Sequence, residues 1–357
     1  MTITTSYPGV YVSEDTTPRF SITGSTTVVP AFAFQRYSNQ GAPATDINYY
    51  HSWQEFYASI NTQASYQHAR YYKSLYTWFM AGGGKCYLVL SGKMQEAVKD
   101  FQDITLVVAA GTGNDIFQGF NQLISSGYKI FGLFDGPEQK ITSGADEVMK
   151  SYPVSAYGAA FYPFCHSDAL DDIVPPSVIA AVCIVKTDST RGVWKAPANF
   201  PVEGFTPQFP VSDELQEKFS GAKALNMIRR FPETGTVIWG ARTLEDSANW
   251  RFIPVRRLFN MVEKDIKAAL SKLIFEPNTQ PTWQRVRTAV DNYLRGLWQQ
   301  GALAGSRPEE AWFVRVGKDI TMTEEDITQQ KLIVEIGIAA SRPAEFIHLK
   351  FSQVITR

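Results

Sequence analysis

The apolar run of residues 178–185 restricts the fold more than any other feature of the chain. Its members are uninterrupted aliphatic residues and one cysteine, so the element that contains them lacks a polar face and has to be buried. The polar residues 188–191 and the following Gly192 are typical of a turn, and we expect the buried element to end there. Trp194, Lys195 and Pro197 then combine a large ring, a charge and a fixed φ, which predicts a rigid loop pinned to a surface.

Length and charge exclude several classes of protein. The chain has 357 residues, of which 44% are hydrophobic and 19% are charged, as in a globular protein of one large domain or two. A formal charge of -1 gives no overall electrostatic attraction to nucleic acid or to an acidic membrane. No apolar run reaches the roughly 18 residues of a membrane span, and residues 1–5 lack the features of a secretion signal. We therefore expect synthesis in the cytoplasm without a signal peptide.

The cysteines Cys86, Cys165 and Cys183 are far apart in the sequence and lie in apolar or aromatic surroundings. This distribution is typical of small buried hydrophobic residues rather than of a disulfide framework or a metal cluster. It fits folding in a reducing cytoplasm.

Residues 85–165 alternate between strand and helix patterns. Strands are predicted at 87–90, 103–110, 130–134 and 156–164, and helical patterns lie near 116–125 and up to Lys150. This order is typical of βαβ units, so we expect a compact α/β unit with a parallel or mixed sheet. A first strand is predicted at 28–34, followed by helical patterns at 52–60 and 71–80.

The second half of the chain is dominated by two amphipathic helices. Apolar residues recur at spacings of three and four in 254–273 and 281–300, and each segment begins with a proline suited to a first helical turn. Gly301 predicts the end of the second helix. Further strands are predicted at 236–239, 312–316 and 332–338.

Both ends of the chain lack the apolar residues for a core of their own. The first 25 residues contain one short β-prone segment with Val10, Tyr11 and Val12, so this end has to lie on something else, such as another chain, or stay mobile. At the other end Ile347, Leu349 and Phe351 alternate with polar residues, which predicts a strand with two different faces.

Positive charge gathers in the second half of the chain. Residues 223–307 contain 14 Lys and Arg side chains against 7 Asp and Glu. This excess indicates either a solvated basic face or a docking surface for an acidic partner.

None of the motifs associated with catalysis is complete. The Gly82–Lys85 stretch has Phe79 and Cys86 where a phosphate-binding loop requires glycine and Ser or Thr, and the turn at 111–113 has Ile116 in the third glycine position of a dinucleotide fingerprint. The four histidines lack the spacing of paired metal ligands, and the neighbours Cys165 and His166 lack an orienting third group. The acidic turn at 168–172 lacks the pattern of a calcium loop. We therefore predict no catalytic residues, cofactor or metal.

Several strings of the chain resemble the contractile tail sheath proteins of phages, R-type bacteriocins and extracellular contractile injection systems. They follow one another in the order of that family, at residues 7–12, 78–79, 82–87, 135–137, 175–177, 187–199, 237–244, 250–257, 275–278, 301–303 and 343–347. The chain is shorter than many phage sheath proteins. In this it resembles the sheath proteins of virulence-cassette and antifeeding-prophage particles. It departs from the family at Gln330, where members often have glycine, and at Ser341, where they often have proline.

The resemblance implies an α+β fold with two domains and two extended arms. The expected parts are an N-terminal arm (1–22), an outer α/β domain (23–175), an inner α/β domain (176–343) and a C-terminal arm (344–357). The arms are expected to add strands to neighbouring subunits. The residues assigned to this contact are Val10, Tyr11, Val12, Phe346, Ile347, Leu349 and Phe351.

The resemblance also implies the partners. They are further copies of the chain in stacked rings, an inner tube protein, and baseplate and terminal cap proteins, with no nucleic acid and no membrane insertion. The charged residues expected to face the tube or a neighbouring subunit are Arg191, Lys195, Arg256, Arg257, Arg285 and Arg287. Trp194 and Pro197 are expected to pack at the junction between the domains. Contraction of the assembly is expected to drive the tube through a target envelope. The particle is expected to assemble in the bacterial cytoplasm and to act after its release.

Two other functions stay open on the sequence alone. An α/β enzyme or nucleotide-binding protein would use the glycine turns at 82–85 or 111–113, and a monomeric binding module would use exposed aromatic residues. Neither alternative predicts rings or tubes.

Overall fold

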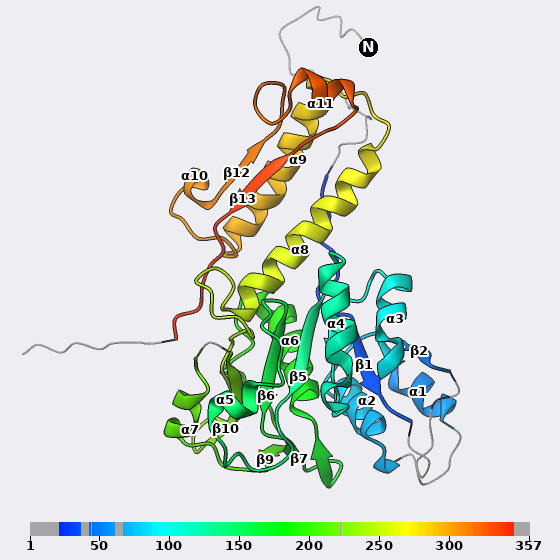
Figure 1. Cartoon of the computed structure of the whole chain (residues 1–357), viewed down its shortest axis with the longest axis vertical. Helices are drawn as coiled ribbons and strands as arrows, with labels where there is room; N and C mark the ends of the chain where they lie inside the picture. Colours follow the sequence, from blue (N-terminus) through cyan, green and yellow to red (C-terminus); the bar gives the residue numbers. More distant parts are fainter. Residues whose placement is uncertain (1–20, 37–42, 44, 61–66, 222, 346–357) are drawn as a thin grey trace, which may run out of the picture.

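The computed structural model describes residues 21–36, 43, 45–60, 67–221 and 223–345. These residues form two lobes, a large one of residues 28–252 and a small one of residues 253–341, joined by a long helix (Figure 1). The fold belongs to the α+β class.

The large lobe is built on an eight-stranded sheet in the order β11-β10-β6-β5-β4-β1-β3-β2. Neighbouring strands are parallel from β3 to β10, and the edge strands β2 and β11 are antiparallel to their neighbours. The strands are β1 (Pro30–Phe34), β2 (Ile47–Tyr50), β3 (Cys86–Leu90), β4 (Leu106–Val108), β5 (Phe131–Asp135), β6 (Gly158–Tyr162), β10 (Leu225–Phe231) and β11 (Gly235–Trp239).

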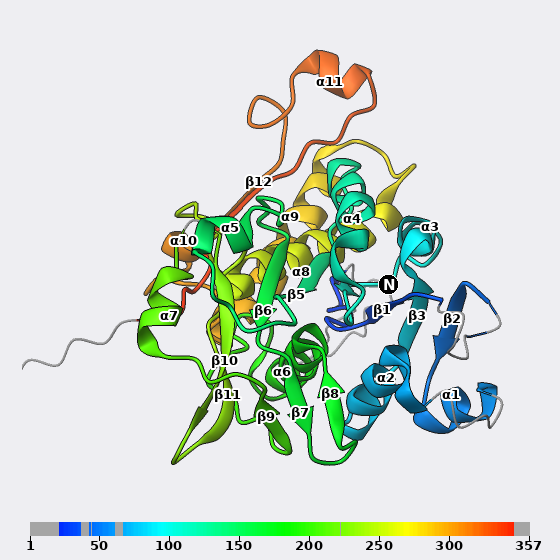
Figure 2. The same cartoon turned by 60° about the horizontal axis from the view of Figure 1, so that its bottom comes forward.

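Helices cover both faces of this sheet, which is why its central strands are apolar on both sides (Figure 2). One face carries α1 (Trp53–Ser59), α2 (Arg70–Met80) and α6 (Pro176–Arg191). The other carries α3 (Met94–Asp100), α4 (Ile116–Ser125), α5 (Ala145–Met149) and α7 (Asp213–Lys218). A separate three-stranded sheet in the order β8-β7-β9 consists of β7 (Cys165–Ser167), β8 (Asp172–Val174) and β9 (Phe205–Pro207).

The small lobe packs two helices against a two-stranded antiparallel sheet. Its elements are α8 (Ile253–Leu270), α9 (Gln280–Gln299), α10 (Pro308–Ala311), β12 (Trp312–Arg315), α11 (Glu324–Thr328) and β13 (Glu335–Ile338). Helix α8 joins the lobes, because Ile253 at its start is buried in the core of the large lobe and Leu258, Val262 and Ile266 are buried in the core of the small one.

The boundary predicted between residues 175 and 176 is wrong. Strand β10 pairs with β6, and β11 pairs with β10, so the sheet of the large lobe continues to Trp239. The lobes separate instead where α8 begins. The apolar run of α6 supplies a buried face of the large lobe rather than the start of a second domain.

The predicted turn at residues 188–191 is also wrong, since α6 continues to Arg191 and ends at Gly192. The polar side chains there bond back along the helix: the hydroxyl of Thr187 donates to the Cys183 carbonyl at 2.7 Å, and that of Thr190 to the Lys186 carbonyl at 2.8 Å. Gly192 has φ 95°, and a Cβ there would lie 2.5 Å from the Trp194 ring. Glycine is required at this helix end for both reasons.

Candidate functional site

The segment of residues 21–27 is anchored to the small lobe. In Figure 1 it runs beside α8 before β1 begins. The amide of Ser25 donates to Asp265 Oδ1 at 3.0 Å, and the hydroxyl of Tyr293 donates to Asp265 Oδ2 at 2.6 Å. Asp265 is buried, and Ile22 packs against the core of the small lobe. Burial and the hydrogen bond to Asp265 raise the pKa of Tyr293, so its hydroxyl stays a neutral donor.

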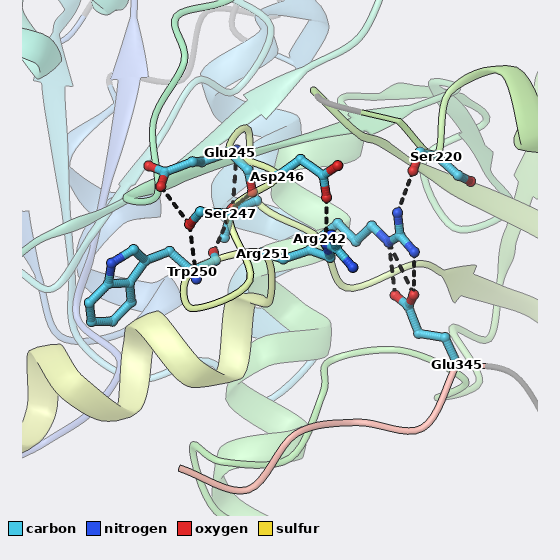
Figure 3. Close-up of polar contacts among 9 residues, drawn as sticks. Ser220, Arg242, Glu245, Asp246, Ser247, Trp250, Arg251 and Glu345 are labelled. Atoms are coloured by element: carbon cyan, nitrogen blue, oxygen red, sulfur yellow. Dashed lines mark hydrogen bonds and ion pairs between the residues drawn. The ribbon is translucent and has the colours of Figure 1, made fainter. Parts of the chain in front are cut away.

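The last described residue, Glu345, is anchored to the large lobe (Figure 3). Both oxygens of its carboxylate lie 3.1 Å from Arg242 Nε, and Oε2 lies 2.6 Å from Arg242 Nη2. The third nitrogen, Nη1, donates to the Ser220 carbonyl. The hydrogen bonds to Glu345 raise the pKa of Arg242, so the guanidinium stays charged.

Arg242 is itself held firmly. Its amide donates to Asn226 Oδ1 at 2.8 Å, and its carbonyl accepts from Asn226 Nδ2 at 2.8 Å. Asn226 lies on β10, is buried, and also donates to the Ala160 carbonyl of β6. Arg242 further pairs with Phe252 in an isolated β-bridge, which closes the loop drawn in Figure 3. The sheet therefore fixes the backbone of Arg242, and the Ser220 carbonyl holds one nitrogen of its guanidinium.

A buried ion pair connects the two lobes. Arg257 of α8 donates to Asp188 of α6 through two nitrogens, at 2.8 and 2.7 Å, and the two side chains are 4% and 5% exposed. Arg257 Nη2 also reaches the Thr27 carbonyl at 3.4 Å. The pair thus joins the end of α6, the start of α8 and the segment before β1.

Arg256 and Arg257 were predicted to present charge to the tube or to a neighbour, and this prediction is wrong. Both side chains are buried inside the protomer. The guanidinium of Arg256 lies over the rings of Trp250 at 4.3 Å and Tyr157 at 4.6 Å, and it donates to Asn260 and Glu263. Because this guanidinium is enclosed by aromatic rings and is buried, it is not presented to a partner.

The other predicted basic residues, Arg191, Lys195, Arg285 and Arg287, are exposed. Arg285 pairs with Glu276 at 3.1 Å, whereas the other three form no ion pair with any residue that the structure describes. Trp194 packs against the core of the small lobe, and the carbonyl of the buried Pro197 lies 3.4 Å from Cys183 Sγ of α6. Their role as a junction between the lobes stays a prediction.

The predicted arm residues Val10, Tyr11, Val12, Phe346, Ile347, Leu349 and Phe351 lie outside the described residues. The anchors next to them were missed in the sequence. Asp265 carries a usable signal, because it falls three residues after Val262 on the apolar face of α8. Arg242 carries none, since its partner is 103 residues away.

The glycine turns are occupied by contacts within the chain. Gly83 donates to the Trp78 carbonyl at 2.9 Å, and the Trp78 indole donates to the Gly84 carbonyl at 2.7 Å, so this turn ends α2. Gly111 donates to Asp135 Oδ2 at 2.8 Å. The cavity beside Gly111 has about 240 Å³, and its charged lining residues already have partners within the chain. Arg70 pairs with Glu138 at 2.8 Å, and Asp135 accepts from two backbone amides. The geometry therefore does not favour the nucleotide-binding alternative.

Burial raises the pKa of all three cysteine thiols, that of Cys183 to about 12, and each is free, as predicted for small buried hydrophobic residues. Within the described ranges, side chains of the metal-binding types form no group of three or more suited to an ion. Of the helices described, none combines the length and the apolar character needed to cross a bilayer.

Among known proteins, a family model matches the part of the chain that contains the small lobe. Residues 245–353 match the family model described as the phage tail sheath C-terminal domain, which begins close to the boundary between the lobes. The tail sheath protein of Vibrio phage KVP40 is 26% identical over 178 residues. That match covers 48% of this chain but only 25% of the length of the curated relative.

Two solved structures match almost the whole chain. A chain of the sheath complex of the extracellular contractile injection system PVC, in the contracted state, is 45% identical with a TM-score of 0.89, and 99% of both chains is covered. A chain of the anti-feeding prophage baseplate in the contracted state is 56% identical with a TM-score of 0.88. Here 98% of this chain and 100% of the other is covered. The chain therefore belongs to the contractile tail sheath protein family, and it is a structural protein rather than an enzyme.

Proposed function

We propose that this sheath protein polymerises helically around an inner tube and contracts to drive that tube through a target envelope. The observation that carries the proposal is the similarity over 99% of the chain to a subunit of a contracted sheath complex. A contact between two different surfaces of identical subunits generates an open helix when it does not close, and this is the symmetry of a long tubular sheath.

Strand exchange by the arms is the proposed contact between subunits. The anchors at Asp265 and Glu345 support it, because each holds the described chain at the point where an arm begins. An acceptor is available in the small lobe. Strands β12 and β13 pair only with each other among the described strands, so each has an edge that an added strand could use.

Contraction is proposed to be a change of packing between rigid protomers that consumes no nucleotide. Two packings of one sequence can differ by only a few kcal/mol per subunit, and subunits linked through their arms would change together. The buried Arg257–Asp188 pair supports this proposal, because it resists movement between the lobes of one protomer.

The proposed partners are further copies of the chain, the inner tube, the baseplate and a terminal cap. Arg191, Lys195, Arg285 and Arg287 are the exposed cations that we assign to a tube surface of acidic character or to a neighbour. Nucleic acid and membrane insertion have no part in the proposal. We infer assembly in the bacterial cytoplasm and action as part of an extracellular particle.

Removal of either arm tests the proposal. We expect deletion of residues 1–14 or of residues 344–357 to abolish long sheaths in negative-stain images, because each deletion removes a strand from the lattice. The truncated proteins should keep the circular dichroism and melting temperature of the intact protomer.

The alternation of residues 347–351 provides a sharper variant. Replacing Ile347, Leu349 and Phe351 together by serine removes the apolar face of the predicted strand, and we expect it to prevent assembly. Replacing His348 and Lys350 by serine is the matched control and should leave sheaths intact. Long sheaths of normal shape from both arm deletions would refute strand exchange.

A further inference from the structure

The described chain crosses from the small lobe back to the large lobe at its C-terminal end. In the small lobe, Ala304 donates to the Ala339 carbonyl at 2.7 Å and Ser341 to the Ala302 carbonyl at 3.1 Å. The hydroxyl of Ser341 adds a bond of 2.9 Å to the Gly301 carbonyl. Beyond this point lie residues 342–345, here called the strap. Figure 1 shows the chain after β13 descending beside the large lobe.

The strap has one polar attachment. Residues 342–344 form no hydrogen bond with any residue that the structure describes, whereas Glu345 forms the forked pair with Arg242. The contact combines three N–O distances of 2.6 to 3.1 Å, and a guanidinium is well suited to such a two-pronged contact with a carboxylate. The side chains are 15% and 24% exposed, so water and salt screen the pair less than a surface pair.

Part of the order of Arg242 does not depend on the strap. Asn226 holds both the amide and the carbonyl of Arg242, and Ser220 accepts from its third nitrogen. An exposed ion pair contributes little because two long side chains have to be immobilised. Here the backbone of Arg242 and one of its guanidinium nitrogens are held by other residues, so Glu345 meets a side chain that is partly ordered beforehand.

We propose that Arg242 and Glu345 form a latch that fixes where the C-terminal arm leaves the protomer, and so which acceptor strand of a neighbouring copy the arm can reach. The inference rests on the proposed function, in which the arm adds a strand to another subunit. Without the latch, the last hydrogen bonds along the described chain are those of Ser341. Four residues of extended chain span about 13 Å, so the root of the arm could then explore a region far wider than the spacing of two strands.

Glu345→Ala is the cleanest test, because Glu345 lies at the end of the described chain and leaves the core untouched. We expect the variant to keep the melting temperature of the protomer and to lower the yield of long sheaths about tenfold in a sedimentation assay. Arg242→Met should lower the yield as well. The double variant should be no worse than the more severe single one, because both changes remove the same contact.

A matched control is available in the large lobe. Arg229 pairs with Asp213 at 2.7 Å, and its side chain is 13% exposed against 15% for Arg242, whereas Asp213 is more exposed than Glu345. This pair does not involve the strap. Asp213→Ala should leave the yield of sheaths unchanged. Electron microscopy of the residual Glu345→Ala sheaths should show short assemblies with variable helical rise.

The outcomes separate the latch from the proposed function. Normal sheaths from Glu345→Ala beside failed assembly of the deletion of residues 344–357 would overturn the latch alone. Normal sheaths from both would overturn strand exchange by this arm as well. A third outcome is that Glu345→Ala lowers the melting temperature and the yield of sheaths together, with additive effects in the double variant. That result would assign Arg242 and Glu345 a merely structural role and would also overturn the latch.

Discussion

At the scale of single residues, two helix ends show the same geometry with different side chains. After α9, Gly301 donates to the Trp298 carbonyl and Ala302 to the Leu297 carbonyl, and Gly301 has φ 83°. After α11, Gln330 donates to the Ile327 carbonyl and Lys331 to the Asp326 carbonyl, and Gln330 has φ 61°. Both are Schellman motifs, but only the first has the residue that adopts this conformation without strain. The departure from the family at Gln330 therefore lies at a position that favours glycine.

Replacing Gln330 by glycine should stabilise the protomer. The left-handed conformation costs a residue with a Cβ about 1–2 kcal/mol, and the greater chain entropy of glycine in the unfolded state returns about half of that. We expect a gain of roughly 0.5–1 kcal/mol in the free energy of unfolding, measured by denaturant titration. Gln330→Ala keeps the Cβ and should change little, and a loss of stability in Gln330→Gly would contradict the interpretation.

The same scale shows where sequence reasoning fails. Arg256 and Arg287 look alike in the sequence, as cations on amphipathic helices, yet one is enclosed by aromatic rings and the other is exposed. What decides between them is the position of Trp250 and Tyr157, which depends on the folded loop and sheet. A count of charges in the sequence assigns both residues to one basic surface. Only the tertiary structure shows that one is buried and the other exposed.

At the scale of elements, the ion pair between α6 and α8 forms a joint between the two lobes. The joint depends on Arg257 and Asp188, whose charges are almost fully removed from water. Breaking a buried pair by removing one charge leaves the other without compensation, which typically costs 3–5 kcal/mol.

Asp188→Asn should therefore be strongly destabilising. We expect a loss of roughly 3 kcal/mol in the free energy of unfolding, measured by denaturant titration of the protomer. Glu96→Gln provides the comparison, because the pair of Glu96 with Lys93 at the start of α3 is exposed and should contribute far less. Equal effects of the two substitutions would mean that the buried pair does not hold the joint.

The elements differ in how far the sequence predicts them. Helices α8 and α9 were predicted within a few residues, because each has an opening proline and a long apolar stripe. The parallel strands of residues 85–165 were predicted from their alternation with helices, and the structure confirms them within a larger sheet. Strand β10 was missed although it continues that sheet. Its pairing with β6 is a contact between distant residues, which periodicity within one segment cannot reveal.

At the scale of the whole molecule, the basic excess of residues 223–307 divides into two parts. Arg256, Arg257 and Arg242 are used inside the protomer, whereas Arg285 and Arg287 of α9 are exposed. An attraction between the sheath and an acidic tube would depend on the second part. The charge of Arg285 is already compensated by Glu276. Arg287 is therefore the residue of the two that should attract an acidic surface more strongly.

Reversing the charge at Arg287 tests this division. We expect Arg287→Glu to weaken binding to purified tubes about threefold to tenfold in co-sedimentation, without changing the melting temperature of the protomer. Lys99→Glu places the same charge change on the exposed face of α3 in the large lobe and should leave tube binding unaltered. Unaltered binding in Arg287→Glu would mean that this face is only solvated.

The course of α8 through both cores gives the protomer a mechanical property. An 18-residue helix is about 27 Å long, so a tilt of about 10° at its first turn displaces its far end by about 5 Å. Since Arg257 fixes the first turn of the helix against α6, the helix acts as a lever whose fulcrum is inside the large lobe. A small reorientation of the large lobe against its neighbours would therefore become a displacement at the far end of the small lobe as wide as the spacing of two strands.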